Sequence, residues 1–314
     1  MHKRFVFILI PLLFLCSCGS PSPSEAKAPV RVGALKGATT IGMVKYIEDA
    51  AESAAFSVVT ADEIVPMIVK GELDMAAIPV NLAATLYQKT GGAVRVLAIN
   101  TLGLTYIVET GGEIQTVEDL RGKTVFATGK SNTPEYTLRR ILREYGLDPE
   151  TDLTLEFKNE PAEVVAHLKL NGGVAMLPQP FVTTAGDTVP GLREAIDLTE
   201  EWGKLDGAGT LVIGVLIART EFLEREADVG AALDACRASV GWVTDNPAEA
   251  APLVEKAGIA PASVAERAIP KCHLTFIEGA EMRETLSAFL KVMFDDAPES
   301  VGGALPGDDF YYVP

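Results

Sequence analysis

The sequence has few of the side chains that usually carry catalysis or hold metal ions. It contains three histidines and four cysteines in 314 residues, and none has the spacing of a metal site. His167 falls on a predicted helix, and His273 follows Cys272 in an apolar segment. No serine or cysteine lies in the strand–turn–helix pattern that exposes a catalytic nucleophile. We therefore expect no metal, no cofactor and no catalytic residues.

Clusters of basic residues are also missing. The chain has 43 Asp and Glu against 27 Lys and Arg, which gives a formal net charge of −16, and no basic run is longer than Arg139–Arg140. Binding to nucleic acid or to anionic lipid through charge depends on clustered Lys and Arg. The charge balance argues against both kinds of partner.

No apolar run is long enough to span a bilayer comfortably. The run Phe5–Leu15 follows a short basic region, which is typical of a secretory signal. The residues up to Cys18 (Leu-Cys-Ser-Cys) resemble the site at which bacterial lipoproteins are cleaved and lipidated, and a plain cleaved signal is the alternative. We predict a signal peptide over residues 1–17, lipidation of Cys18 and a Ser/Pro-rich tether over residues 18–29. The protein would then be anchored to the outer face of the cytoplasmic membrane, or lie in the periplasm.

Two cysteines remain after this segment, Cys236 and Cys272. A disulfide between them is compatible with an oxidising compartment and would stabilise the fold by about 3–4 kcal/mol. Two separately buried thiols are the alternative, and the sequence leaves both open.

The chain contains a repeat. Residues 60–82 and 159–181 align without a gap at an offset of 99, with identical residues at four positions. Each segment predicts a polar loop, an amphipathic helix, a turn, a short apolar strand and a proline-containing loop, and Asp62 is the expected N-cap of the first helix. The strand–loop–helix units that precede them, 32–47 and 125–140, correspond at an offset of 93. The chain therefore consists of two β-α-β-α-β-like halves.

Two such halves predict an α/β protein with two lobes. Each lobe would be an open, mostly parallel sheet with helices on both faces, and ligands of such sheets bind beyond the carboxyl ends of the strands. We assign residues 30–109 and 214–314 to lobe 1 and residues 110–213 to lobe 2. Two crossover strands, near 105–110 and 213–218, would join them.

These features resemble the type II substrate-binding proteins of bacterial ABC importers, in particular the group that binds sulfonates, taurine and thiamine precursors. The resemblance is carried by residues 33–43 (GALKGATTIGM), 71–81 (GELDMAAIPVN), 117–136 and 175–182 (AMLPQPFV). It implies a monomeric extracytoplasmic protein that traps a small polar or anionic molecule by hinge closure. It also implies delivery to a permease with its ATPase. The alternatives are an enzyme of the same fold, such as a lyase of menaquinone biosynthesis, and a sensory lipoprotein.

The loops that follow equivalent strands predict the ligand site. Helix starts with free N–H groups attract oxyanions and the polar edges of heterocycles. The candidate ligand-binding residues are Gly37, Thr39, Thr40, Asn81, Ser131, Asn132, Thr133 and Gln179. We expect Thr39 and Thr40 to face Asn132 and Thr133 across the cleft. Helix capping is a compatible role for the threonines and for Asn132, and a structural turn is the alternative role for Asn81 and Gln179.

Overall fold

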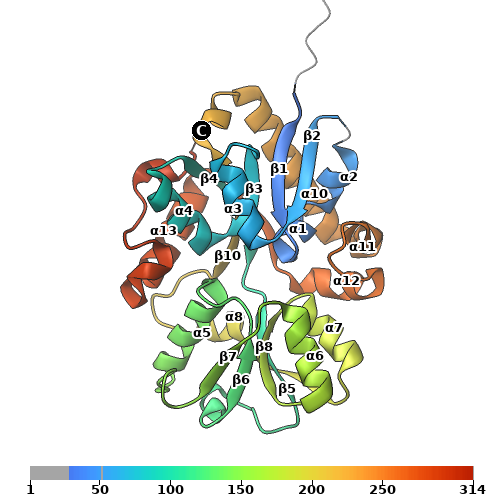
Figure 1. The fold of residues 1–314 in the computed structure, drawn as a ribbon, viewed down its shortest axis with the longest axis vertical. Helices are drawn as coiled ribbons and strands as arrows, with labels where there is room; N and C mark the ends of the chain where they lie inside the picture. The colour runs from blue at the N-terminus through green and yellow to red at the C-terminus, as the bar shows by residue number, and fades with distance from the viewer. Residues whose placement is uncertain (1–27, 51, 314) are drawn as a thin grey trace, which may run out of the picture.

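The computed structural model describes residues 28–50 and 52–313, and these residues form two lobes, each built on one sheet (Figure 1). The predicted signal peptide and Cys18 lie outside the described residues. Within them, no helix combines the length and the apolar character needed to cross a membrane.

Lobe 1 holds a six-stranded sheet with the order β11-β4-β10-β3-β1-β2. Strand β1 pairs in parallel with β2 and β3, whereas β10 is antiparallel to β3 and β4. The strands are β1 (Val30–Leu35), β2 (Ala54–Val59), β3 (Met75–Pro79), β4 (Val94–Leu102), β10 (Val212–Arg219) and β11 (Leu274–Glu278).

Helices surround this sheet. They are α1 (Ala38–Ile41), α2 (Val44–Asp49), α3 (Ala61–Val69), α4 (Val80–Thr90), α9 (Thr220–Leu223), α10 (Glu226–Asp245), α11 (Pro247–Lys256), α12 (Ala262–Ala268) and α13 (Gly279–Asp296), with the short 3₁₀ helices η2 (Ile269–Lys271), η3 (Pro298–Val301) and η4 (Asp308–Phe310). The aromatic C-terminal segment packs on lobe 1, because Tyr311 forms a bridge with Val96 of β4.

Lobe 2 holds a five-stranded sheet with the order β7-β6-β8-β5-β9. Its strands are β5 (Thr105–Thr110), β6 (Thr124–Ala127), β7 (Thr154–Phe157), β8 (Val174–Pro178) and β9 (Leu192–Asp197). Its helices are η1 (Val117–Leu120), α5 (Thr133–Glu144), α6 (Pro161–Asn171), α7 (Phe181–Thr188) and α8 (Leu198–Gly203).

The strand orders confirm the repeat. The run β10-β3-β1-β2 in lobe 1 corresponds to β5-β8-β6-β7 in lobe 2, with one antiparallel pair followed by two parallel pairs in each. The two-lobed α/β fold is confirmed. The sheets are mixed rather than mostly parallel, because the strands beside the crossovers run antiparallel to their neighbours.

The crossovers lie elsewhere than predicted. Residues 105–110 form β5, entirely within the second sheet, and residues 213–218 lie inside β10 of the first sheet. The chain passes between the sheets at residues 103–104 and returns between α8 and β10. Gly103 marks the first passage, because a Cβ at this position would clash with Thr199 and Leu211. The sequence placed the crossover in the strand near residues 105–110, whereas the chain has already changed lobes before Thr105.

Local features correct one further prediction and decide between two alternatives that the sequence left open. Thr60, not Asp62, is the N-cap of α3, and its backbone N–H donates to the Glu63 carboxylate at 2.9 Å. Cys236 and Cys272 are free thiols buried in different hydrophobic clusters, not a disulfide. Burial raises the pKa of each thiol to about 12.

One hydrophobic cluster runs through both lobes. It contains Ile99 and Phe289 from lobe 1 together with Ile107 and Trp202 from lobe 2. The rings of Trp202 on α8 and Phe289 on α13 lie 5.6 Å apart between centroids. The lobes are therefore packed together near the return crossover.

A buried carboxylate fixes the start of β1. Asp74 is 6% exposed and accepts hydrogen bonds from the Arg31 backbone N–H at 2.9 Å and from Arg31 Nε at 3.0 Å. Burial opposes ionisation of Asp74, but the hydrogen bonds and the positive charge of Arg31 outweigh it and hold the pKa of the carboxyl below its ordinary value. The ionised form of Asp74 is thus part of the folded state.

We expect Asp74→Asn to lower the free energy of unfolding at pH 7 by about 2 kcal/mol, because a charged hydrogen-bond acceptor is lost. A folded-state pKa below the unfolded value stabilises the protein above about pH 4, and this stability is lost as pH falls through the folded pKa. Urea denaturation at a series of pH values should show wild type and variant converging between about pH 5 and pH 2. Asp49→Asn, at an exposed ion pair with Lys45, is the control and should change little. A constant gap at all pH values would contradict the assignment.

Candidate functional site

Four helices begin at the seam between the lobes. Helices α1 and α4 follow the carboxyl ends of β1 and β3 in lobe 1, and α5 and α7 follow β6 and β8 in lobe 2 (Figure 1). Helix N-termini carry unpaired N–H groups and partial positive charge, so the seam favours the acceptor atoms of a ligand. All eight candidate residues lie in these connections.

Asn81 joins the two lobes. It lies in the first turn of α4 and is 4% exposed. Its Nδ2 donates to the Ser131 carbonyl oxygen at 3.1 Å, and its Oδ1 accepts from Thr133 Oγ1 at 3.0 Å. The structure therefore brings together three of the candidate residues, from both lobes, in a closed arrangement.

The loop of Gly37, Thr39 and Thr40 is held mainly by its own lobe. Thr40 is fully buried, and its hydroxyl donates to the Leu35 carbonyl oxygen. Asn100 of β4, which we did not predict, donates from Nδ2 to the Thr39 carbonyl oxygen at 3.0 Å. The Thr40 hydroxyl thus has a partner in its own lobe, and the hydroxyl of Thr133 donates to Asn81 of lobe 1.

The matching loop in lobe 2 is also internally bonded. Ser131 adopts a positive φ of 61°, and its N–H donates to Glu135 Oε2 at 2.6 Å. Asn132 occupies the N-cap position of α5 without a side-chain capping bond, and its carbonyl oxygen accepts from the Glu135 N–H at 3.0 Å. The Asn132 side chain therefore does not cap α5, a role that the sequence left open alongside ligand binding.

Gln179 presents a donor without a partner. It is 1% exposed, its Oε1 accepts from Thr183 Oγ1 at 2.8 Å, and its backbone N–H donates to the Leu104 carbonyl oxygen at 3.0 Å. Its Nε2 is buried with no hydrogen-bond partner. An unmet buried donor costs about 1–3 kcal/mol, so this position favours an acceptor atom from outside the chain.

Two threonines share this property and were missed in the sequence. Thr105 Oγ1 and Thr199 Oγ1 are buried without partners, and both adjoin the first crossover at Gly103. In the same segment, the Leu104 carbonyl oxygen accepts from the Gln179 backbone N–H. The unpartnered donors of Gln179, Thr105 and Thr199 therefore all lie at or beside residues 103–105. No sequence pattern distinguishes these threonines from others in β-rich segments, because their burial arises from tertiary packing.

The predicted ligand-binding side chains are all uncharged. Across residues 28–50 and 52–313, no group of three or more His, Cys, Asp or Glu side chains is placed to hold a metal ion. Hydroxyl and amide groups bind and orient a ligand by donating and accepting hydrogen bonds.

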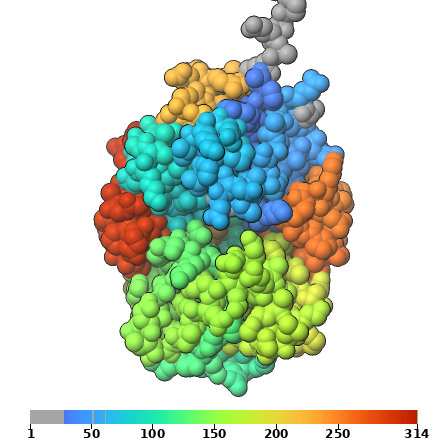
Figure 2. All heavy atoms as spheres, in the orientation of Figure 1, coloured from blue at the N-terminus to red at the C-terminus, as the bar shows by residue number. Residues whose placement is uncertain are grey.

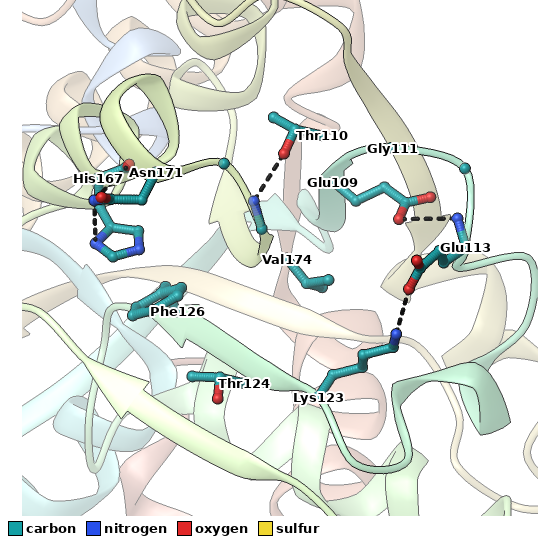
Figure 3. Close-up of a pocket in the computed structure, with 13 residues that line it drawn as sticks. Glu109, Thr110, Gly111, Glu113, Lys123, Thr124, Phe126, His167, Asn171 and Val174 are labelled. Carbon is teal, nitrogen blue, oxygen red and sulfur yellow. Dashed lines mark hydrogen bonds and ion pairs between the residues drawn. The ribbon is translucent and has the colours of Figure 1, made fainter.

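A cavity of about 470 Å³ lies away from the seam, where β6 and β8 begin (Figure 3). Its lining includes the stacked rings of Phe126 and His167, 3.7 Å apart, and the ion pair between Lys123 and Glu113. None of the candidate ligand-binding residues lines it. His167 thus has a packing role on Phe126.

The architecture defines a two-lobed protein with the type II periplasmic-binding-protein fold. A family model described as "Menaquinone biosynthesis" matches residues 30–293, and the chain belongs to this family. The resemblance to importer-associated binding proteins thus holds for the fold, while the family is that of menaquinone biosynthesis.

Solved structures support the fold. An ABC transporter protein from Parabacteroides distasonis superposes with a TM-score of 0.77 at 23% identity, covering 91% of this chain and 99% of that one. The periplasmic aliphatic sulphonate binding protein SsuA from Escherichia coli gives 0.72 at 19% identity, covering 92% and 93%. The periplasmic nitrate-binding protein NrtA from Synechocystis gives 0.61 at 14%, covering 87% and 84%. A search of curated proteins found no match.

Proposed function

We propose that the chain binds a small polar or anionic organic molecule between its lobes and closes over it. The observation that carries this proposal is the fully buried Gln179 Nε2, which lacks a partner where helix N-termini of both lobes meet. Thr105 and Thr199 add two hydroxyl donors beside the same crossover. A ligand with acceptor oxygens, such as a carboxylate or a sulfonate, would satisfy these groups.

Family membership favours conversion of the ligand. The family match covers nearly the whole folded part of the chain, whereas structural likeness below 25% identity concerns the fold alone. We accordingly put forward an enzyme of menaquinone biosynthesis as a candidate function. In such an enzyme the uncharged candidate side chains would act by orienting the substrate, and the closed lobes would exclude water.

Delivery of the ligand is the other candidate. The N-terminal segment resembles a lipoprotein signal, and neighbours of this fold include binding proteins for sulfonates and nitrate. In this case lipidation at Cys18 would place the protein outside the cytoplasmic membrane, and the closed form would dock on a permease.

Thermal-shift screening with sulfonates, nitrate, thiamine precursors and aromatic carboxylates tests binding, because a ligand of the folded state raises its apparent stability. Each compound that stabilises the protein is then incubated with it and analysed by mass spectrometry. Unchanged recovery of a tightly bound compound supports delivery, and catalytic release of a product supports an enzyme. If neither these compounds nor cellular metabolites bind, the proposal of a ligand site at the seam is wrong.

A further inference from the structure

Ion pairs connect the lobes at both ends of the seam. Among the described residues, three such pairs join lobe 1 to lobe 2, and we refer to them together as the interlobe latch. They are Arg140 with Asp296, Arg267 with Asp187, and Lys271 with Glu194. The N–O distances are 2.7 Å in the first pair and 2.6 Å in the third.

The latch straddles the site. Arg140 on α5 meets Asp296 at the end of α13, at the left of the molecule as drawn (Figure 1). Arg267 on α12 meets Asp187 on α7 at the right. The space-filling view shows the lobes touching at both of these sides (Figure 2). Opening the lobes about the crossovers would therefore separate charged pairs at both sides of the seam.

The three pairs differ in their exposure. The side chains of Arg140 and Asp296 are 25% and 18% exposed, so solvent and salt screen this pair least. The side chains of the other two pairs are between 40% and 53% exposed. Exposed pairs contribute little one by one, but all three would be lost in the same opening motion.

The basic partner changes lobes from one side to the other. It lies in lobe 2 for Arg140 and in lobe 1 for Arg267 and Lys271. The latch is therefore not a general attraction between a positive and a negative lobe, and it matches charges only when the lobes are closed in this register. The hydrogen bonds of Asn81 to Ser131 and Thr133 form in the same arrangement.

We propose that the interlobe latch holds the protein closed without help from a ligand, and that its separation controls entry to the seam. The control of ligand entry rests on the proposed function, whereas the effect on lobe closure does not. A measurement of closure in the free protein thus distinguishes failure of the latch from failure of the ligand proposal.

The test measures the distance between the lobes by electron–electron resonance in the full chain without ligand. Asp62→Cys on α3 and Glu163→Cys on α6 place one spin label on each lobe, on the same face of the molecule (Figure 1). The native thiols Cys236 and Cys272 are buried, which protects them from labelling, and the two N-terminal cysteines are replaced by serine.

The latch variant combines Asp296→Asn, Asp187→Asn and Glu194→Gln, which remove three charges with little change of shape. We expect the population of long interlobe distances to rise about tenfold over wild type, because three weak pairs are lost together. Raising the salt concentration should shift wild type in the same direction and the latch variant less.

The control variant removes three ion pairs that lie within single lobes. Asp295→Asn, Asp234→Asn and Glu156→Gln change the net charge equally and should leave the distances unchanged. Exchanging the charges of the third pair, with Lys271→Glu and Glu194→Lys, should keep the lobes closed. A latch variant with the same distance distribution as wild type at every salt concentration would overturn the proposal, as would equal opening of the control.

Discussion

Gln179→Glu is expected to weaken ligand binding at least about 100-fold. The substitution keeps the size of the side chain and leaves an acceptor for the Thr183 hydroxyl. It removes the unpartnered Nε2 donor and places a carboxylate at a position that is 1% exposed. A buried charge without a partner is costly, and it also repels an anionic ligand. Isothermal titration with a compound identified by thermal shift measures the loss.

The control separates binding from folding. Gln115→Glu makes the same chemical change at an exposed glutamine of lobe 2, whose Nε2 bonds the Gly112 carbonyl oxygen, and should leave affinity unchanged. Gln179→Met removes the donor without adding charge, so it should weaken binding while the variant remains folded by circular dichroism. Wild-type affinity in both Gln179 variants would remove this residue from the site.

The repeat made most of the fold predictable. Two segments share the same order of loop, helix, turn and strand. Their duplication indicated two sheets of equivalent topology. The run from Val94 to Thr110 was predicted as two strands, the second of them leading toward the other lobe, and the structure has two strands here in different lobes. The sequence did not reveal that the chain changes lobes before Thr105, at Gly103, because Gly103 packs closely against Thr199, which is 96 residues away.

The candidate site was predictable only in position. Polar residues after equivalent strands indicated where the lobes meet, and Asn81, Ser131 and Thr133 do lie together there. The partner of each group was not predictable, because a hydroxyl such as that of Thr40 can bond its own loop or another lobe. Charge pairs between α5 and α13 or α7 and α12 likewise depend on how the lobes close.

The family match favours the enzyme, whereas the fold does not distinguish the enzyme from the binding protein. The fold is compatible with ligand capture and with catalysis, since function depends on the site rather than on the architecture. The unpartnered donors of Gln179, Thr105 and Thr199 are compatible with both, because under either proposal a ligand would begin by satisfying these groups. The two candidate functions are therefore distinguished by whether the bound molecule is converted, and not by how tightly it binds.

Phe289→Ala is expected to lower the free energy of unfolding by about 3–5 kcal/mol, the usual cost of removing a large buried aromatic ring. Phe289 is 1% exposed and packs on Trp202 of the other lobe within the hydrophobic cluster that both lobes share. Because this cluster joins the lobes, the substitution should lower the stability of both lobes.

The two tryptophans of the chain report on this coupling separately. Trp202 belongs to lobe 2 and Trp242 to α10 of lobe 1. Urea denaturation followed by fluorescence therefore monitors lobe 1 in a Trp202→Phe background and lobe 2 in a Trp242→Phe background. In the presence of Phe289→Ala, both transitions should move to lower urea and remain coincident, as expected for cooperative unfolding. Leu170→Ala, at a side chain that is 83% exposed, should move neither. A shift confined to the Trp242 signal would show that the lobes unfold independently and that the shared cluster does not couple them.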